Sequence, residues 1–256
     1  MALLYDHKEA NIRRTWALFT GFLVLVIGLG WAFSYVFNDR AILVFAVLFS
    51  VVTSIVGYWS SDRIALALTR AVPIEKKDNS YLWNIIENLT IAAGLPMPKV
   101  YVVPEGQINA FATGRDPKHA SVAVTQGALE RLANEELEGV IAHELSHVGN
   151  RDILVSTVAV VLAGVITMLS DFFLRSLLWG GSGGWRGGRD GGNRGAGGLF
   201  ALLGIALSIL APLGAMLMQL AISRRRESLA DASGALLTRF PEGLASALEK
   251  IGKDVA

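Results

Sequence analysis

Hydrophobic residues in this 256-residue chain are concentrated in four long stretches, and polar residues fill the segments between them. A helix that crosses a bilayer needs about 20 predominantly apolar residues. The stretches that reach or approach this length are Thr15–Phe37, Ala41–Trp59, Ile153–Ser170 and Leu199–Ile222. The first two contain no charged residue and are joined only by residues 38–40. The pattern therefore predicts four transmembrane helices arranged as two hairpins.

The second hairpin has two interpretations. Ile153–Ser170 is close to the lower length limit for a span, and Pro212 interrupts the fourth stretch. Membrane helices tolerate proline better than soluble ones do, so two further spans are expected, with a buried hairpin of a soluble domain as the alternative. Between these stretches, residues 180–198 contain eleven glycines among nineteen residues. This composition cannot bury a core, and it predicts a flexible loop.

Composition supports a membrane protein and narrows its partners. Hydrophobic residues make up 52% of the chain and the mean hydropathy is +0.46, both high for a soluble protein. Lysine and arginine are more numerous on the side of the spans that carries both termini and residues 60–152, which the positive-inside rule places in the cytoplasm. The net charge of +1 gives no reason to expect nucleic acid, and the lack of cysteine excludes disulfides and thiolate ligands.

The segment of residues 60–152 is expected to form a small α+β domain. An amphipathic helix is predicted for Tyr81–Gly94, and strands are predicted for Lys99–Val103, Asn109–Gly114 and Ala120–Thr125. The last of these strands is expected at the edge of the sheet. An exposed edge can bind an extended peptide through main-chain hydrogen bonds, although a purely structural sheet explains each strand equally well.

Residues 143–147 read His-Glu-Leu-Ser-His, a HExxH motif within a predicted helix. Asn134 is expected to cap that helix, acidic residues occupy its first turn, and Gly149 marks its end. Positions i and i+4 lie on the same helix face, so His143 and His147 can bind one metal ion with Glu144 beside it. Two of only four histidines in the chain fall in this motif, which favours a zinc hydrolase over two unrelated surface histidines.

The motif supplies two ligands, whereas a catalytic zinc site usually has three protein ligands and one water. The long zinc-protease signature would place a glycine three residues and a histidine six residues after the second motif histidine. This chain has Asn150 and Ile153 at those positions, which excludes that class. The remaining candidates for the third ligand are His7, His119 and a carboxylate, of which Glu227 is the strongest.

Glu227 is followed one helical turn later by Asp231. A carboxylate on the metal, with a second carboxylate that accepts the free ring N–H of a ligating histidine, is a recurring arrangement. The spacing favours this interpretation, and an ordinary charged helix face remains the alternative. His119 and Arg226 are weak candidates for stabilising an oxyanion.

Three motifs and two hydrophobic hairpins, which together cover nearly the whole chain, resemble the pattern of a known protein family. The motifs read HELSH, NAFATG and RRRESLAD. With them, the chain resembles the HtpX family of membrane zinc endopeptidases and, more distantly, the prenyl-protein endopeptidases of the same clan. The resemblance implies a zincin-like domain with one Zn²⁺ bound by His143, His147 and Glu227, and with Glu144 as the general base.

The resemblance also implies a multi-pass protein of the bacterial inner membrane, with its catalytic domain and both termini in the cytoplasm. Its implied substrates are damaged or misfolded membrane proteins and unfolded polypeptides. Ser228 stands where the family usually has an aromatic residue, which is a mild departure. Family members continue beyond the position of Ala256 through a His-Pro-containing segment, which is compatible with a shortened carboxyl terminus and leaves any role of that segment open.

These observations predict a mainly α-helical integral membrane protein with a small sheet. Its expected parts are a transmembrane hairpin (1–60), a HExxH domain (61–152), a second hydrophobic hairpin (153–222) and a helical part with Glu227 (223–256). A transporter or channel is disfavoured, because the clear spans lack the charges on which transport depends. A catalytically inactive membrane scaffold or chaperone of the same fold is the alternative to an enzyme. The oligomeric state does not follow from the sequence.

Overall fold

Thirteen elements follow one another in the part of the chain that the computed structural model describes, namely residues 2–180, 224–254 and scattered positions between 204 and 217. They are α1 (Ala2–Phe37), α2 (Arg40–Leu68), β1 (Val72–Pro73), α3 (Ser80–Ala93), β2 (Lys99–Val103), β3 (Ala110–Gly114), the 3₁₀ turn η1 (Pro117–His119), β4 (Ala120–Thr125), α4 (Gln126–Arg131), α5 (Asn134–Gly149), α6 (Asp152–Gly180), α8 (Arg224–Thr238) and α9 (Pro241–Asp254). Apart from its first residue, the glycine-rich segment 180–198 lies outside the described residues, as does most of the predicted fourth span. The expected mainly helical class with a small sheet is confirmed.

The chain divides into two compact units. The first, which we call the sheet unit, consists of Met1–Thr15, Tyr58–Thr157 and Ile222–Ala256. The second, which we call the hairpin unit, consists of Trp16–Gly57 and Val158–Ala221. The HExxH motif and Glu227 both belong to the sheet unit.

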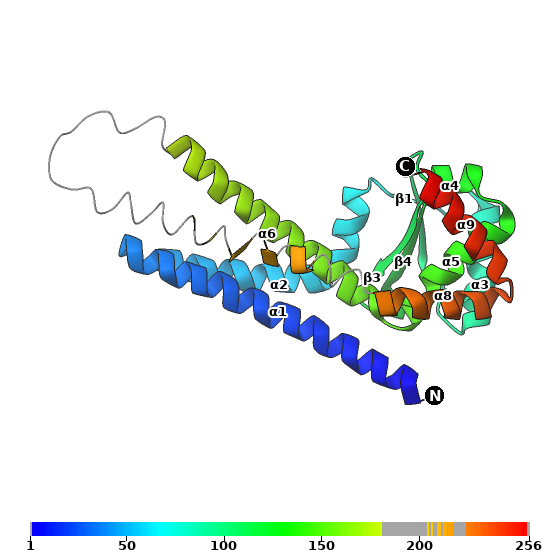
Figure 1. Ribbon diagram of the computed structural model, residues 1–256, viewed down its shortest axis with the longest axis horizontal. Coiled ribbons are helices and arrows are strands. Elements are labelled where there is room, and N and C mark those ends of the chain that lie inside the picture. Colours follow the sequence, from blue (N-terminus) through cyan, green and yellow to red (C-terminus); the bar gives the residue numbers. More distant parts are fainter. Residues whose placement is uncertain are drawn as a thin grey trace. The chain divides into compact units, whose positions relative to one another are not determined.

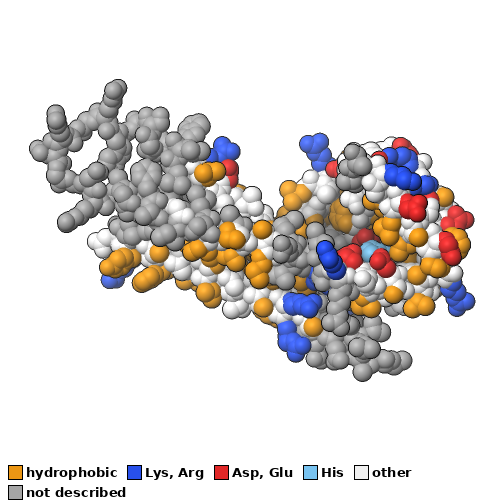
Figure 2. Space-filling model, in the orientation of Figure 1, with side chains coloured by type: hydrophobic (Ala, Val, Ile, Leu, Met, Phe, Trp, Pro, Cys, Tyr) orange, Lys and Arg blue, Asp and Glu red, His pale blue; other side chains and the backbone are white. Residues whose placement is uncertain are grey.

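Within the described residues, three helical segments are long and apolar enough to cross a membrane: Ala10–Tyr35, Arg40–Leu68 and Asp152–Asp171. They correspond to the first three hydrophobic stretches of the sequence. Large side chains on them, such as Trp31 and Phe45, are exposed, and Figure 2 shows hydrophobic side chains spread over the surface of α1 and α2. Apolar surface of this extent is unfavourable in water and favourable in lipid, so the three helices fit a membrane protein.

The sheet of the first unit has four strands in the order β1-β2-β4-β3 (Figure 1). β2 and β4 are parallel, whereas the β1–β2 and β3–β4 pairs are antiparallel. The prediction of an edge strand at Ala120–Thr125 is wrong. Val122 of this strand pairs with Val100 on one side and with Ala112 on the other, so β4 is central and all six of its residues are buried. β3 therefore lies at the edge of the sheet.

Helix α3 and the predicted strands agree with the sequence pattern to within one residue. α3 begins after Asn79, whose side chain accepts a hydrogen bond from the N–H of Leu82. It ends at Gly94, which adopts the left-handed conformation (φ 65°) that glycine enters without steric cost.

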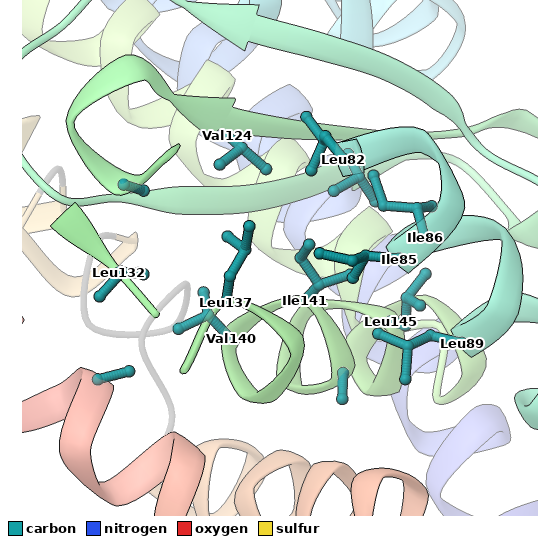
Figure 3. Close-up of a cluster of buried hydrophobic side chains, with 14 of the residues drawn as sticks. Leu82, Ile85, Ile86, Leu89, Val124, Leu132, Leu137, Val140, Ile141 and Leu145 are labelled. Atoms are coloured by element: carbon teal, nitrogen blue, oxygen red, sulfur yellow. The ribbon is translucent and has the colours of Figure 1, made fainter. Parts of the chain in front are cut away.

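The main hydrophobic core lies between the sheet and the helices α3 and α5. Figure 3 shows Leu82 of α3, Ile141 of α5 and Val124 of β4 directed into one cluster, and all three side chains are fully buried. On the opposite face of the sheet, Leu66 of α2 packs against Ala123. Alternate residues of β4 therefore contribute to two cores on opposite faces of the sheet. The core on the α5 side holds the HExxH helix against the sheet.

Helix α5 begins at Asn134 with Ala133 as its N-cap, so the prediction that Asn134 is the cap is wrong by one residue. The N–H of Ala133 donates to Oε2 of Glu136 at 2.7 Å, so an acidic residue in the first turn accepts a backbone N–H that has no partner within the helix. Glu136 also accepts hydrogen bonds from Ser246 and Lys250 of α9, both at 2.6 Å. These contacts attach the carboxyl-terminal helix to the start of the motif helix.

Glycines allow α8 and α9 to approach α5 closely. A Cβ atom at Gly234 of α8 would lie 3.0 Å from the backbone nitrogen of His143. A Cβ atom at Gly139 of α5 would lie 2.7 Å from the backbone nitrogen of Leu244 in α9. Both separations are shorter than ordinary van der Waals contact, so the helices pack backbone against backbone at these glycines, and α8 places its first turn beside the motif histidines.

Candidate metal centre

Helices α5 and α8 bring three potential metal ligands together, namely His143, His147 and Glu227. The Nε2 atoms of the two histidines are 3.2 Å apart. Oε2 of Glu227 lies 3.5 Å from Nε2 of His143 and 3.8 Å from Nε2 of His147. The three ligand atoms thus form a small triangle, with two corners from one helix and the third from another.

The size of this triangle fits a tetrahedral zinc ion. Zinc binds imidazole nitrogen and carboxylate oxygen at about 2.0–2.1 Å, which places neighbouring ligand atoms of a tetrahedral site about 3.3 Å apart. The separations of 3.2, 3.5 and 3.8 Å lie close to this value. Two imidazoles and one carboxylate are also the ligand set of many zinc hydrolases. The side chain of Glu227 is 44% exposed, so the group can be reached from solvent.

Each motif histidine meets a carboxylate through its other ring nitrogen. Oδ1 of Asp231 lies 2.9 Å from Nδ1 of His143, although the two groups are not aligned as in a hydrogen bond. Oδ2 of Asp152 lies 3.3 Å from Nδ1 of His147 and is hydrogen-bonded to it. In both imidazoles the carboxylate lies on the Nδ1 side, and Nε2 is the nitrogen that faces the other potential ligands.

Glu144 is directed toward the edge strand, where its Oε2 accepts a hydrogen bond from the N–H of Ala112 at 2.9 Å. Its side chain keeps partial solvent contact, but protein atoms surround the carboxyl group. This burial raises the pKa of Glu144, and the imidazoles of His147 and His143 offset only part of the increase. A carboxylate with a raised pKa holds a proton more readily near neutral pH, which suits a general base.

The electrostatics around the second histidine favour positive charge. Burial lowers the pKa of His147, but the hydrogen bond to Asp152 and the carboxylates of Glu144 and Glu227 outweigh this effect and raise it. Burial lowers the pKa of Arg226, and the nearby Asp152 opposes that change. The carboxylates of Asp152, Glu144 and Glu227 therefore create a negative potential around the site, and a bound cation would also experience it.

Of the remaining two histidines, which the sequence left open as ligands, the structure describes the side chain of His119 but not that of His7. Nδ1 of His119 lies 2.8 Å from Oδ1 of Asp116 at the 3₁₀ turn, and its side chain is half exposed. His119 is not part of the metal-ligating group found among the described residues. The side chain of His7 lies outside the described part of the chain.

Sequence reasoning missed three groups at this site. Asp152 stands immediately before an apolar stretch, and that unusual position for a buried acid is the signal that could have identified it. Asn11, which hydrogen-bonds Asp152, lies 141 positions away and carries no local signal. The N–H of Ala112 is a backbone group, so only the pairing of the strands reveals its role.

Comparisons with known proteins identify the family of this chain. The sequence profile of peptidase family M48 matches residues 76–253. A "Protease HtpX homolog" from Caldanaerobacter subterraneus subsp. tengcongensis is 48% identical over 250 residues, which cover 97% of this chain and 83% of that relative. One from Thermoanaerobacter pseudethanolicus is 46% identical over 250 residues with the same coverage. A crystal structure of S. mikatae Ste24p aligns with a TM-score of 0.47 and 19% identity, over 98% of this chain and 59% of that chain.

The family profile covers more than half of the chain, and the two HtpX homologs align with nearly all of it. Both relatives are named as proteases, which favours an enzyme over an inactive scaffold. The apolar helices account for the attachment to a membrane. The chain therefore belongs to peptidase family M48 and is a membrane-bound metalloprotease.

Proposed function

We propose that this enzyme is a zinc-dependent endopeptidase that cleaves damaged or misfolded membrane proteins at the cytoplasmic face of the bacterial inner membrane. His143, His147 and Glu227 bind one Zn²⁺ per chain, and Glu144 is the general base. The observation that carries the proposal is the triangle of Nε2, Nε2 and Oε2 atoms with the dimensions of a tetrahedral zinc site.

When bound, zinc supplies Lewis acidity and makes water acidic enough to lose a proton near pH 7. Glu144 takes that proton on its carboxylate while water attacks the peptide carbonyl, and it then passes the proton to the leaving amine nitrogen. The N–H of Ala112 holds Oε2 of Glu144, which leaves Oε1 for the transfer. Asp231 lies beside Nδ1 of His143, and a small rotation of its carboxylate would let it accept the Nδ1–H and orient that imidazole with Nε2 toward the metal.

The edge strand β3 offers a binding site for an extended substrate peptide. The N–H and C=O groups of one strand residue point to the same side, so Ala112, whose N–H points to Glu144, also directs its carbonyl away from β4. Ala110 has the same orientation, two residues earlier. An extended peptide paired with this edge would lie along Glu144 and would be held by main-chain hydrogen bonds that do not depend on its sequence.

Chain connectivity favours substrates at the membrane surface. The apolar helix α6 begins at Asp152, only five residues after His147. At 1.5 Å per helical residue, this separation places the histidine within about 10 Å of the first turn of α6. Basic residues are in excess on the side of the predicted spans that carries the site, which supports a cytoplasmic location, and the three apolar helices support a multi-pass arrangement.

The proposal is tested with the full-length protein purified in detergent. We expect cleavage of casein, its loss on treatment with a chelator, and its return when Zn²⁺ is added. Cleavage that persists in a metal-free sample would contradict a metal mechanism. Stoichiometric zinc binding without any cleavage would instead support the inactive scaffold.

The role of Glu144 is tested by the Glu144→Gln variant, which removes the charge but keeps the shape. It is expected to bind zinc as the parent does, to unfold at the same temperature, and to lose cleavage. Glu130→Gln, at an exposed carboxylate of α4, is the matched control and is expected to keep full activity. Full activity in the zinc-loaded Glu144→Gln variant would overturn the assignment of the base.

A further inference from the structure

His147 is connected to the amino-terminal helix through a buried carboxylate. Oδ2 of Asp152 accepts the hydrogen bond from Nδ1 of His147, and Oδ1 accepts one from Nδ2 of Asn11 in α1 at 2.5 Å. The same Nδ2 also donates to the carbonyl of Asn150 at 3.3 Å. Two parts of the chain that lie 141 positions apart, the helix α1 and the segment from His147 to Asp152, thus meet at one carboxyl group.

The residues of this hydrogen-bond network are buried. Asp152 is 2% exposed and Asn11 is 3% exposed. A buried carboxylate costs several kcal/mol unless hydrogen bonds and opposite charge compensate it. Asn11 and His147 supply the hydrogen bonds, and the buried guanidinium of Arg226 supplies favourable charge. Each partner is therefore needed to keep the carboxylate of Asp152 in place.

We propose that Asp152 is a positioning residue for His147, and that Asn11 positions Asp152 in turn, so that metal affinity depends on the amino-terminal helix α1. The inference rests on the metal site proposed above. Asp152 accepts the Nδ1–H of the imidazole, which fixes the tautomer that leaves Nε2 as a ligand. Without Asn11, the carboxylate keeps its charge but loses the group that fixes its orientation.

The two carboxylates beside the histidines differ in their surroundings. The side chain of Asp231 is 47% exposed, whereas that of Asp152 is 3% exposed. Solvent screens a charge at an exposed position and can replace a lost hydrogen bond there, which is not possible at a buried one. Loss of Asp152 is therefore expected to weaken the metal site more than loss of Asp231.

The test measures zinc affinity of the full-length, detergent-solubilised protein by competition with a chromophoric chelator. Asp152→Ala and Asn11→Ala are expected to weaken zinc binding by roughly 10–100-fold, the range typical of groups that orient a ligand. Because the two residues act in series, the double variant is expected to bind zinc about as weakly as Asp152→Ala alone. Thr15→Val is the matched control, since Thr15 is buried one turn further along α1 and, among the described residues, its hydroxyl donates to the carbonyl of Asn11 and not to Asp152.

A second readout separates positioning from general loss of structure. The absorption spectrum of the cobalt-substituted protein reports the geometry around the metal, and it is expected to change in Asn11→Ala but not in Thr15→Val. The conservative Asp152→Asn variant keeps an acceptor for Nδ1–H and is expected to recover part of the zinc affinity lost in Asp152→Ala.

The outcomes are distinct. A zinc affinity and a cobalt spectrum of Asn11→Ala that match those of the parent would overturn the inference, even if Asp152→Ala fails to fold. Additive losses in the double variant would also overturn it. A parent protein that binds no zinc at all would instead refute the proposed metal site, which is a different result.

Discussion

Gly234 controls the distance between the two helices that supply the proposed ligands, and Gly234→Ala tests this directly. The added Cβ would lie 3.0 Å from the backbone nitrogen of His143 and 3.2 Å from its Cα. Ordinary van der Waals contact begins at 3.4 Å, so α8 must retreat from α5 by about 0.4 Å. The atoms on the other side are backbone and cannot rotate away. The retreat moves the first turn of α8, and Glu227 with it, away from the histidines.

Two opposing effects decide how much Gly234→Ala changes the stability of the protein. Alanine is favoured over glycine within a helix by about 0.8–1 kcal/mol, whereas forcing a group into a packed interface costs about 1–3 kcal/mol. The expected net result is a loss of about 0–2 kcal/mol in stability. Oε2 of Glu227 already lies 3.5 and 3.8 Å from the two Nε2 atoms, beyond the tetrahedral separation of about 3.3 Å. Further displacement is expected to weaken zinc binding by about tenfold, equivalent to about 1.4 kcal/mol.

The assay compares zinc affinity and thermal unfolding of Gly234→Ala with those of Gly252→Ala. A Cβ atom at Gly252 of α9 meets nothing within 4 Å, so this control changes helix propensity without changing packing. It is expected to stabilise the protein by up to about 1 kcal/mol and to leave zinc affinity unchanged. If Gly234→Ala stabilised the protein equally and bound zinc as tightly as the parent, the packing argument would be refuted.

Three further predictions concern stability, pH and the metal. Ile141→Ala leaves a cavity beneath the motif helix and is expected to cost about 2–5 kcal/mol, seen as a lower midpoint of thermal unfolding. Burial alone would raise the pKa of Glu136, but hydrogen bonds led by that from Lys250 lower it from 4.5 to about 2. The ionised carboxylate therefore stabilises the fold above pH 4.5, and this contribution is lost as the pH falls from about 4.5 to about 2. Because Lys250 is 42% exposed, screening reduces the contribution to about 1–2 kcal/mol, so Glu136→Gln is expected to be less stable than the parent at pH 7 but not near pH 2. Glu227→Ala is expected to weaken zinc binding by more than the roughly 10–100-fold typical of supporting residues.

Each of these has a result that would contradict it. An unchanged unfolding midpoint in Ile141→Ala would show that the core beneath the motif is not tightly packed. A difference between Glu136→Gln and the parent that is constant from pH 7 to pH 2 would exclude ionisation as its cause. Zinc binding of parent strength in Glu227→Ala would remove Glu227 from the ligand set.

Local patterns were sufficient to predict the elements that hold the site. The helical spacing of His143 and His147 depends only on the geometry of one helix, and it is present in α5 as predicted. The end of α3 at Gly94 and the strands before the motif also follow from nearby residues. The cap of α5 was misplaced by one residue because Asn134 suits a cap chemically, yet the helix begins one residue earlier with Ala133 as its cap, whose N–H donates to the side chain of Glu136.

The sequence by itself determined the HExxH pair, the apolar stretches and the short list of third ligands, because each depends on spacing within one segment. Only the tertiary structure decided which strand is the edge, since strand order depends on pairing between distant segments. Glu227 meets the motif because a glycine lets α8 approach α5. The contact of Asn11 and Asp152 behind His147 is equally non-local. Side chains that are separated by many residues converge through packing, and packing leaves no periodic signal in the sequence.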